Sequence, residues 1–196
     1  KLLVAPFILH ARMLALIGRE TANAAKGLPA RIIAKMNSLV DPEVIAALYR
    51  ASQAGVKVDL IIRGVCCLRP GVKGLSDNID VVSIVGRFLE HARVFHFLNG
   101  GEDEVYLASA DWMPRNLDRR IELMFPVESK DLQQKVMTAL DSMFLDNVKS
   151  RRLMPDGTYK RRRPNKGEEP FRAQLHLYRQ AAAALDVLGA SVGMDQ

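Results

Sequence analysis

The sequence predicts an α/β fold, and three observations lead to this prediction. The segments 31–36 and 56–62 have the apolar composition of strands, and a helical pattern that starts at Asp41 lies between them. A strand, a helix and a strand within about thirty residues form a right-handed βαβ unit, so the two strands should pair in parallel. Further strands are expected at about 80–85, 92–98, 104–109 and 119–127.

The first half of the chain has clear helix boundaries. Residues 7–26 show helical spacing of apolar side chains, and Gly27 ends this helix in a C-cap position. The next helix begins with Asp41 as N-cap and Pro42 at the first helical position, and it ends at Gly55. Two well-bounded helices and the strands around them indicate a folded unit.

The second half contains a turn and another helix. Asn99-Gly100-Gly101 supplies the turn between the strands at 92–98 and 104–109. Residues 131–145 form an amphipathic pattern with apolar side chains on one face. The long loop at 65–78 is a candidate functional segment, because long loops in compact domains often carry function.

From Lys149 onward the chain becomes strongly basic. Its cations are Arg151, Arg152, Lys160, Arg161, Arg162 and Arg163. A solvated linker and an arm that binds a polyanion both remain open for this segment. A helical pattern resumes at 171–188, and 189–196 reads as a frayed tail. The predicted domains are a catalytic unit at 1–148, a basic linker or arm at 149–170, and a C-terminal helix and tail at 171–196.

Composition limits the class of protein. The chain has 196 residues, of which 48% are hydrophobic and 26% charged, enough for one globular core with extensions. Its net charge of +6 points to an anionic partner, such as a nucleic acid, another polyanion, a nucleotide or a membrane surface. Aromatic residues make up only 6%, so a stacking platform for single strands is not indicated.

The N-terminus and the cysteines bear on the location. The apolar start resembles a signal peptide, but His10 and Arg12 interrupt it and no cleavage site follows. The chain begins with Lys1, so we expect a piece of a longer protein.

Cys66 and Cys67 are adjacent and do not readily pair, which suits a reducing, cytoplasmic setting; a vicinal metal or redox pair is the alternative role. Membrane association stays open, although no apolar run is long enough to span a bilayer.

One histidine stands out as a candidate for chemistry. His91 precedes Arg93 by two residues at the start of a predicted strand, so their side chains should point the same way. An imidazole beside a permanent cation suits phosphoryl chemistry, because the cation offsets charge on the transferring group. Arg63 follows the strand 56–62, at the end where open α/β sheets bind ligands. The alternative is that His91 is purely structural; His96 falls on the opposite face.

Seven short motifs are specific when taken together. They are Gly-Leu-Pro at 27–29, Lys-Met-Asn-Ser-Leu-Val-Asp at 35–41, Ile-Arg-Gly-Val-Cys at 62–66, Ser-Asp-Asn-Ile at 76–79, Ile-Val-Gly-Arg-Phe-Leu-Glu-His-Ala-Arg-Val at 84–94, Asn-Gly-Gly at 99–101 and Ser-Ala-Asp-Trp-Met-Pro-Arg-Asn at 109–116. With these motifs nearly the whole chain resembles the C-terminal catalytic region of the long, ATP-dependent polyphosphate kinases. The resemblance implies a phospholipase D-like fold, a mixed sheet flanked by helices, with this chain as the second of two related units.

The chain departs from the wider phospholipase D signature of His-x-Lys, Asp, then Ser or Thr with Asn. Arg93 replaces the lysine, and the positions where an aspartate would follow hold Leu98 and Asn99. These departures count against a nuclease or lipase and agree with the kinase branch.

The resemblance also implies a reaction. The terminal phosphate of ATP is transferred reversibly to polyphosphate through a phosphohistidine, which the family carries upstream of this region. His91 matches the second essential histidine, an acid–base partner, and Arg63 matches a contact to nucleotide phosphate. Mg²⁺ is expected to be bound mainly by the upstream part, and no metal ligands are predicted in this chain. The expected partners are ATP or ADP, polyphosphate, the upstream domains of the same protein and further copies in a homo-oligomer. The chain alone is expected to be inactive.

Several supporting residues have two interpretations. Arg93, Arg115 and Arg119 either line a path for polyphosphate or are surface charges. Glu122 either orients His91 or Arg93, or forms a plain ion pair; Asp111 either orients an arginine or caps a turn. The alternative function is a non-catalytic basic module that binds nucleic acid through 149–163, but no zinc spacing, helix-turn-helix or aromatic RNA-binding motif supports it.

Overall fold

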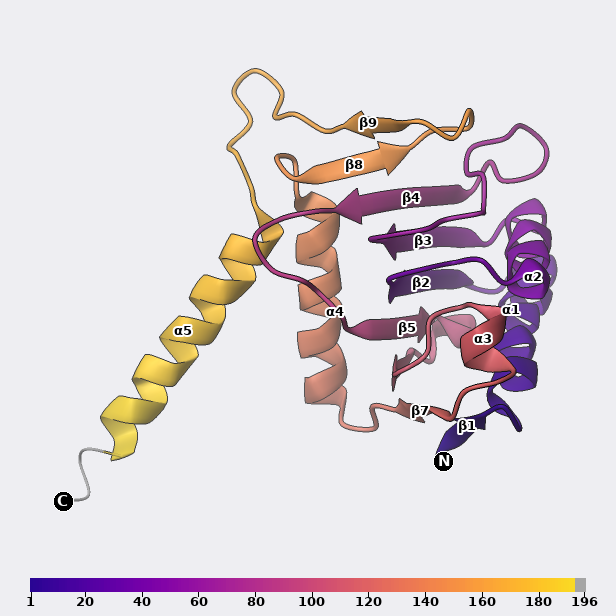
Figure 1. The fold of residues 1–196 in the computed structure, drawn as a ribbon, viewed down its shortest axis with the longest axis horizontal. Helices are drawn as coiled ribbons and strands as arrows, with labels where there is room; N and C mark the ends of the chain where they lie inside the picture. Colours follow the sequence, from indigo (N-terminus) through magenta and orange to yellow (C-terminus); the bar gives the residue numbers. More distant parts are fainter. Residues whose placement is uncertain (193–196) are drawn as a thin grey trace.

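A nine-stranded mixed sheet forms the centre of the computed structural model, which describes residues 1–192 (Figure 1). The strands are β1 Leu3–Ala5, β2 Arg31–Met36, β3 Lys57–Ile62, β4 Ile79–Ile84, β5 Arg93–Phe97, β6 Glu104–Ala108, β7 Glu122–Pro126, β8 Ser150–Leu153 and β9 Tyr159–Arg161. The helices are α1 Leu9–Ala25, α2 Pro42–Gln53, α3 Pro114–Leu117, α4 Lys130–Leu145 and α5 Ala173–Val192, with a 3-10 turn at Asn99–Gly101. The strands lie side by side in the order β1-β7-β6-β5-β2-β3-β4-β8-β9.

The predicted βαβ unit is confirmed at the centre of the sheet. Strands β2, β3 and β4 pair in parallel, with Arg31 opposite Lys57 and Val58 opposite Ile79. The N-cap of α2 also has the predicted form, because the Asp41 carboxylate accepts a hydrogen bond from the Val44 amide at 2.9 Å. All other pairings in the sheet are antiparallel, so the sheet is mixed, as expected.

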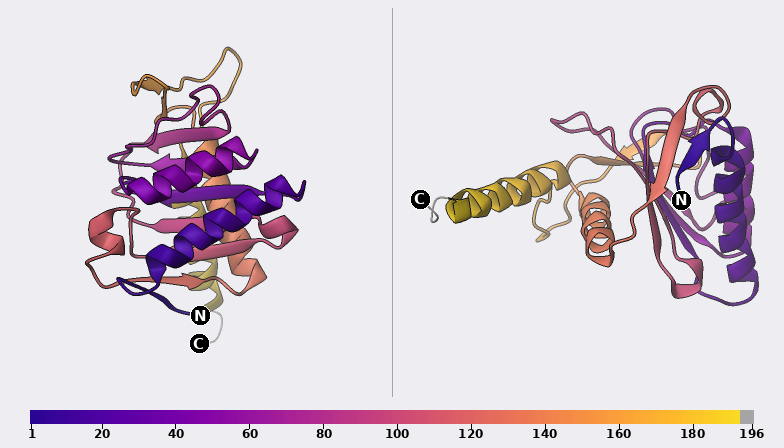
Figure 2. Two further views of the ribbon diagram at one scale, coloured as in Figure 1. Left: turned by 90° about the vertical axis from the view of Figure 1, so that its right-hand side faces the viewer. Right: turned by 90° about the horizontal axis from the view of Figure 1, so that it is seen from below.

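Helices cover both faces of the sheet and create two cores. Helices α1 and α2 lie on one face, and α4 lies on the other (Figure 2). The larger core, under α1 and α2, includes Trp112, whose ring stacks on Phe95 with centroids 4.9 Å apart. The smaller core packs α4 against residues such as Ile33 and Val105. Helix α5 extends away from this body, and within the described residues no helix is long and apolar enough to cross a membrane.

The basic segment after residue 148, predicted as either a solvated linker or a polyanion-binding arm, is not a solvated linker. Strand β8 pairs with β4, and β9 pairs with β8, so residues 150–161 extend the sheet by a hairpin. Ser150 and Leu153 are buried while the two arginines between them are exposed. The prediction for this segment was based on its many positive charges. Its structure depends instead on the burial of Ser150 and Leu153 and on the pairing with β4.

Two shorter segments were also missed or misplaced. Strand β1 was not predicted; its three residues pair with β7 at the edge of the sheet, and so short a strand leaves little periodicity to detect. The predicted frayed tail is helical from Gly189 to Val192. The rest of that tail, 193–196, lies outside the described residues.

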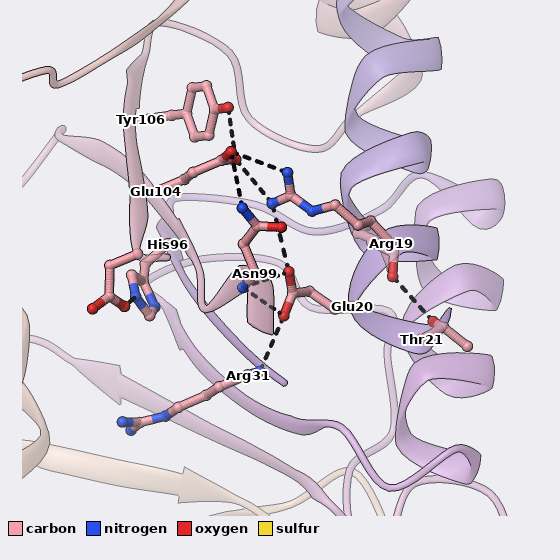
Figure 3. A network of polar contacts seen from close by, with 10 residues as sticks. Arg19, Glu20, Thr21, Arg31, His96, Asn99, Glu104 and Tyr106 are labelled. Carbon is pink, nitrogen blue, oxygen red and sulfur yellow. Dashed lines mark hydrogen bonds and ion pairs between the residues drawn. The ribbon is translucent and has the colours of Figure 1, made fainter. Parts of the chain in front are cut away.

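A buried ion network fastens α1 to the loop end of the β5–β6 hairpin (Figure 3). The carboxylate of Glu20, which is 0% exposed, accepts hydrogen bonds from the Asn99 amide at 3.0 and 3.2 Å and from the Arg31 amide at 3.3 Å. Arg19 binds both oxygens of Glu104 at 3.0 and 2.8 Å. Burial raises the pKa of Glu20, although its hydrogen bonds and the Arg19 charge oppose the shift. The network lies at the end of the sheet where β2 begins.

Replacing Glu20 tests the importance of this network for stability. Glu20→Ala would leave the Asn99 and Arg31 amides without an acceptor in a buried place, so we expect a loss of about 3 kcal/mol in the free energy of unfolding. Glu102→Ala, at an exposed position of the same hairpin, should change it by less than about 0.5 kcal/mol. Urea melts of both variants measure the difference, and equal melts would show that the network adds nothing.

Candidate active site

The end of the sheet opposite that network gathers residues from distant parts of the chain. Parallel strands β2 and β3 end there, and the antiparallel pairings bring the starts of β5 and β7 and the end of β6 to the same place. We call this end of the sheet the carboxyl edge. It is where open α/β sheets bind ligands.

All six predicted site residues line one cavity of 550 Å³ at the carboxyl edge. They are His91, Arg63, Arg93, Asp111, Arg115 and Glu122. Asn37, Ser38, Ser109, Asn116 and Arg120 complete the lining. Residues that are far apart in the sequence therefore meet at one place, and four of the lining side chains are arginines. This geometry brings the residues together without assigning a role to any of them.

Arg93 is the most firmly held of these arginines. Its side chain is 10% exposed, and its Nε and Nη2 donate to the two oxygens of Asp111 at 3.1 and 3.3 Å. The Asn37 amide donates to Asp111 Oδ1 at 2.8 Å, which fixes the carboxylate in turn. Of the two interpretations of Asp111, the structure shows the one in which it orients an arginine. Arg93 is therefore not a surface charge.

His91 lies against Arg93 as the sequence spacing predicted, although it precedes β5 rather than belonging to it. Arg93 Nη1 is 2.8 Å from His91 Nδ1 and Nη2 is 3.2 Å from Nε2, while Nη1 also donates to the His91 carbonyl at 2.9 Å. A guanidinium has only donors, so it can bind only a ring nitrogen that carries a lone pair. Both ring nitrogens face guanidinium nitrogens, so a neutral imidazole can accept at only one of the two contacts. His91 is exposed and so open to a ligand.

Arg63 is partly exposed at the end of β3. Its backbone is held on both sides, because its amide donates to Met36 at 3.3 Å and its carbonyl accepts from the Ser83 hydroxyl at 3.3 Å. Within residues 1–192 its guanidinium forms no ion pair. A cation with a fixed backbone and a free head group in a cavity is well placed to bind an anion.

The other arginines differ in part from the prediction. Arg115 lines the cavity, but Arg119 does not; Arg120, which the sequence did not single out, takes that place. The backbone of α3 and the turn after it decides which side chain faces inward, since the Arg120 amide bonds to the Arg115 carbonyl at 3.0 Å. Three arginines lie within six positions, and the sequence alone could not choose among them.

Glu122 does not orient His91 or Arg93, which was one of its two interpretations. Its two oxygens accept hydrogen bonds from the Ser109 hydroxyl and the Asn116 amide group. Asn116 is buried beside it, so Glu122 fixes the walls of the cavity. Nor does it form the plain ion pair that was the other possibility, because both its partners are neutral.

Two other groups lie outside this cavity. Burial raises the pKa of the Cys66 thiol to about 11, so it is not a ready thiolate for redox or metal chemistry.

His10 lies between two carboxylates, with Nδ1 2.8 Å from Asp118 and Nε2 3.4 Å from Asp41. The ligand atoms of these three residues lie within 4.8 Å of one another. Only the contact from Nδ1 to Asp118 is a hydrogen bond, and Nε2 has no hydrogen-bond partner in the described chain, so the bonded role that the structure shows for His10 is to join α1 to the end of α3.

The family follows from comparison with known proteins. Residues 2–174 match the sequence model of the family described as polyphosphate kinase C-terminal domain 2. This chain belongs to the polyphosphate kinase family. The polyphosphate kinase of Pseudomonas aeruginosa is 55% identical over 183 residues, which cover 93% of this chain and 26% of the relative. That of a Synechocystis strain is 54% identical over 183 residues, 93% of this chain and 25% of the relative.

Solved structures agree with this membership. The polyphosphate kinase from Porphyromonas gingivalis superposes with a TM-score of 0.90 at 41% identity, over 95% of this chain and 28% of that one. The chain thus spans about a quarter of the length of the polyphosphate kinases that it matches.

The phospholipase D-like fold is also confirmed. The phospholipase D family member Nuc from Salmonella typhimurium superposes with a TM-score of 0.53 at 14% identity, over 82% of this chain and 97% of that one. NucT from Helicobacter pylori gives a TM-score of 0.55 at 15% identity, over 74% of this chain and 94% of that one. At this level of identity the likeness concerns the fold alone.

Proposed function

We propose that this chain forms part of the active site of an enzyme that reversibly transfers the terminal phosphate of ATP to polyphosphate. The observation that carries the proposal is the cavity at the carboxyl edge, where His91 and four arginines meet in a member of the polyphosphate kinase family. The phosphohistidine of the reaction would lie on the upstream part of the protein, and this chain would supply the second histidine and a charge clamp.

The arginines suit a phosphoryl group in transfer. Such a group carries charge on its equatorial oxygens, and guanidinium forks bind phosphate oxygens in a bidentate manner. Arg93 needs little further ordering, because Asp111 already holds it by two hydrogen bonds. Arg63, free of ion pairs in the described chain, would bind a phosphate of the nucleotide. Arg115 and Arg120 are exposed and would neutralise further charge.

His91 would act as an acid–base group. With Nδ1 facing Arg93 as acceptor, the proton on Nε2 could be donated to a phosphate oxygen or a leaving group. A phosphate oxygen that accepts from Arg93 Nη1 would compete with His91 Nδ1 for this donor, while Asp111 keeps the guanidinium in place. The role is an acid–base one rather than that of the phosphorylated nucleophile.

The residues of this cavity do not fit a Mg²⁺ site. Mg²⁺ prefers free carboxylate oxygens and water. Both oxygens of Asp111 accept from Arg93 and one also from Asn37, and both oxygens of Glu122 accept from Ser109 and Asn116. The surrounding arginines would also repel a cation. The Mg²⁺ that ATP chemistry needs would therefore be bound mainly by the upstream part of the protein.

Transfer of label from ATP tests the proposal. The full-length protein, incubated with γ-labelled ATP and Mg²⁺, should acquire label that is acid-labile and base-stable, and pass it to polyphosphate. ATP labelled at the α-phosphate is the control and should leave the protein unlabelled. A protein that takes up no γ-label, yet binds nucleic acid through its basic segment, would favour the non-catalytic module instead.

A further inference from the structure

A second group of cations continues along the carboxyl edge beyond Arg63. Strands β3, β4, β8 and β9 are successive neighbours in the sheet. The pairing of Ile84 with Ser150, and of Arg151 with Arg161, brings the end of β4, the start of β8 and the end of β9 to this edge. Cationic side chains occupy these ends and the nearby start of α5. We call five of them, Arg87, Lys149, Arg161, Arg163 and Arg172, the basic strip.

Two adjacent cavities accompany the basic strip. One, of 590 Å³, is lined by Arg87, Lys149 and Arg172 beside apolar side chains of α5 and the loop after β4. The other, of 400 Å³, is lined by Arg161, Arg163 and the neighbouring Arg162. The segment 146–149 contributes to both cavities, so they adjoin. A ligand that follows the edge would pass from one to the other.

Two carboxylates lie beside the strip: that of Asp146, and that of Glu168, which accepts hydrogen bonds from Asn165 and from Asn147 in the lining of the smaller cavity. Asp146 lines the larger cavity, but its carboxylate already accepts hydrogen bonds from four backbone amides, those of residues 148, 149, 150 and 173. No residue of the strip forms an ion pair with any other residue of 1–192. The five cations of the strip outnumber these two carboxylates, so the local potential is positive and attracts anions.

Two of the five cations, Arg161 and Arg163, lie at the end of the β8–β9 hairpin, which is fixed to the body. Arg162 donates to the Phe144 carbonyl at 2.6 Å, at the C-terminus of α4, where carbonyl groups are free. Arg161 donates to the Val148 carbonyl through Nε and Nη2 at 3.2 and 3.1 Å, which leaves its Nη1 for a ligand. Arg162 therefore has a structural role, whereas Arg161, held through one side of its guanidinium, and Arg163 line the smaller cavity.

We propose that the basic strip binds the polyphosphate chain beyond the phosphates held in the His91 cavity. This proposal rests on the proposed function. With strands about 4.8 Å apart, the ends of β3 and β9 are separated by roughly 14 Å along the edge. A long, flexible polyanion could span the distance, whereas tripolyphosphate would occupy the cavity alone. Contacts would be to phosphate charges only, so binding should depend strongly on salt.

A charge-matched pair of variants of this 196-residue chain tests the strip. The strip variant carries Arg87→Gln, Lys149→Gln and Arg163→Gln; the control carries Lys26→Gln, Arg50→Gln and Lys135→Gln, all exposed and outside both cavities. Affinity for long-chain polyphosphate and for tripolyphosphate is measured by calorimetry over a salt series. We expect the strip variant to bind the long chain about tenfold less tightly, with a salt slope smaller by about 2, and tripolyphosphate unchanged.

Each alternative outcome has its own signature. Equal weakening in the strip and control variants would mean that only net charge matters, which would overturn the proposal. The proposal would also be overturned if a single-stranded oligonucleotide of equal charge bound more tightly than polyphosphate. A different result would contradict the proposed function. Tripolyphosphate and ATP would then bind no more tightly to the unchanged chain than to an Arg63→Gln variant. Thermal melts of both triple variants confirm that they remain folded.

Discussion

His91→Ala in the intact enzyme is expected to lower turnover by about 10²–10⁴-fold, because a general acid–base group contributes on this scale. The fold should be unaffected, since His91 is exposed and precedes β5 rather than lying in either core. Its contacts with Arg93 add little to stability, because Arg93 is held independently by Asp111. Steady-state kinetics with ATP and polyphosphate, beside a thermal melt, measure both effects.

The matched control for this variant is His176→Ala. His176 lies on α5 beside the ring of Phe171 and outside the cavity at the carboxyl edge. The His176→Ala substitution should leave turnover within about twofold of that of the unchanged enzyme, because His176 lies outside the proposed active site. Near-normal activity of His91→Ala would remove His91 from the mechanism and leave the arginines as the contribution of this chain.

The centre of the fold could be predicted because its signals are local. Asp41 as N-cap, Gly27 after α1 and the apolar strands β2 and β3 each mark an element within a few residues. The hairpin β8–β9 could not be predicted in this way, since its pairing partner β4 lies about seventy residues earlier. Its charge content suggested a solvated linker or a polyanion-binding arm, and only tertiary pairing with β4 makes it part of the sheet.

The site was predictable to a similar degree. The two-residue spacing of His91 and Arg93 placed them together, and the end of β3 placed Arg63 at the edge where ligands bind. The partners of these residues come from elsewhere in the chain: Asp111 reaches Arg93 from the end of β6, and Asn37 reaches Asp111 from the end of β2. Spacing in a sequence cannot show such contacts. The choice of Arg120 over Arg119 likewise depends on the turn after α3.

The isolated 196-residue chain is expected to fold cooperatively. It contains a nine-stranded sheet with a hydrophobic core on each face, and the largest buried side chains, including Trp112 and Phe95, lie before β8 and not on α5. A core of this size is sufficient for an independent domain. A single sharp transition in circular dichroism on heating would show this, and a broad, non-cooperative melt would contradict it.

The same folded chain is expected to be catalytically inert, with turnover at the background of the assay. Phosphoryl transfer requires a nucleophile, an aligned acceptor, a charge clamp and usually Mg²⁺. In the proposed function the cavity would supply the clamp and one acid–base histidine, while its two carboxylates are engaged in hydrogen bonds rather than free for a metal. The polyphosphate kinases that this chain matches are about four times as long, so the missing groups have an obvious source in the rest of such a protein. Assays of phosphate transfer from ATP and from polyphosphate, run with the folded chain and with the full-length enzyme side by side, decide the matter. Robust turnover by the chain alone would mean that these residues contain a complete active site. It would contradict the proposal that the active site is shared with the upstream part of the protein.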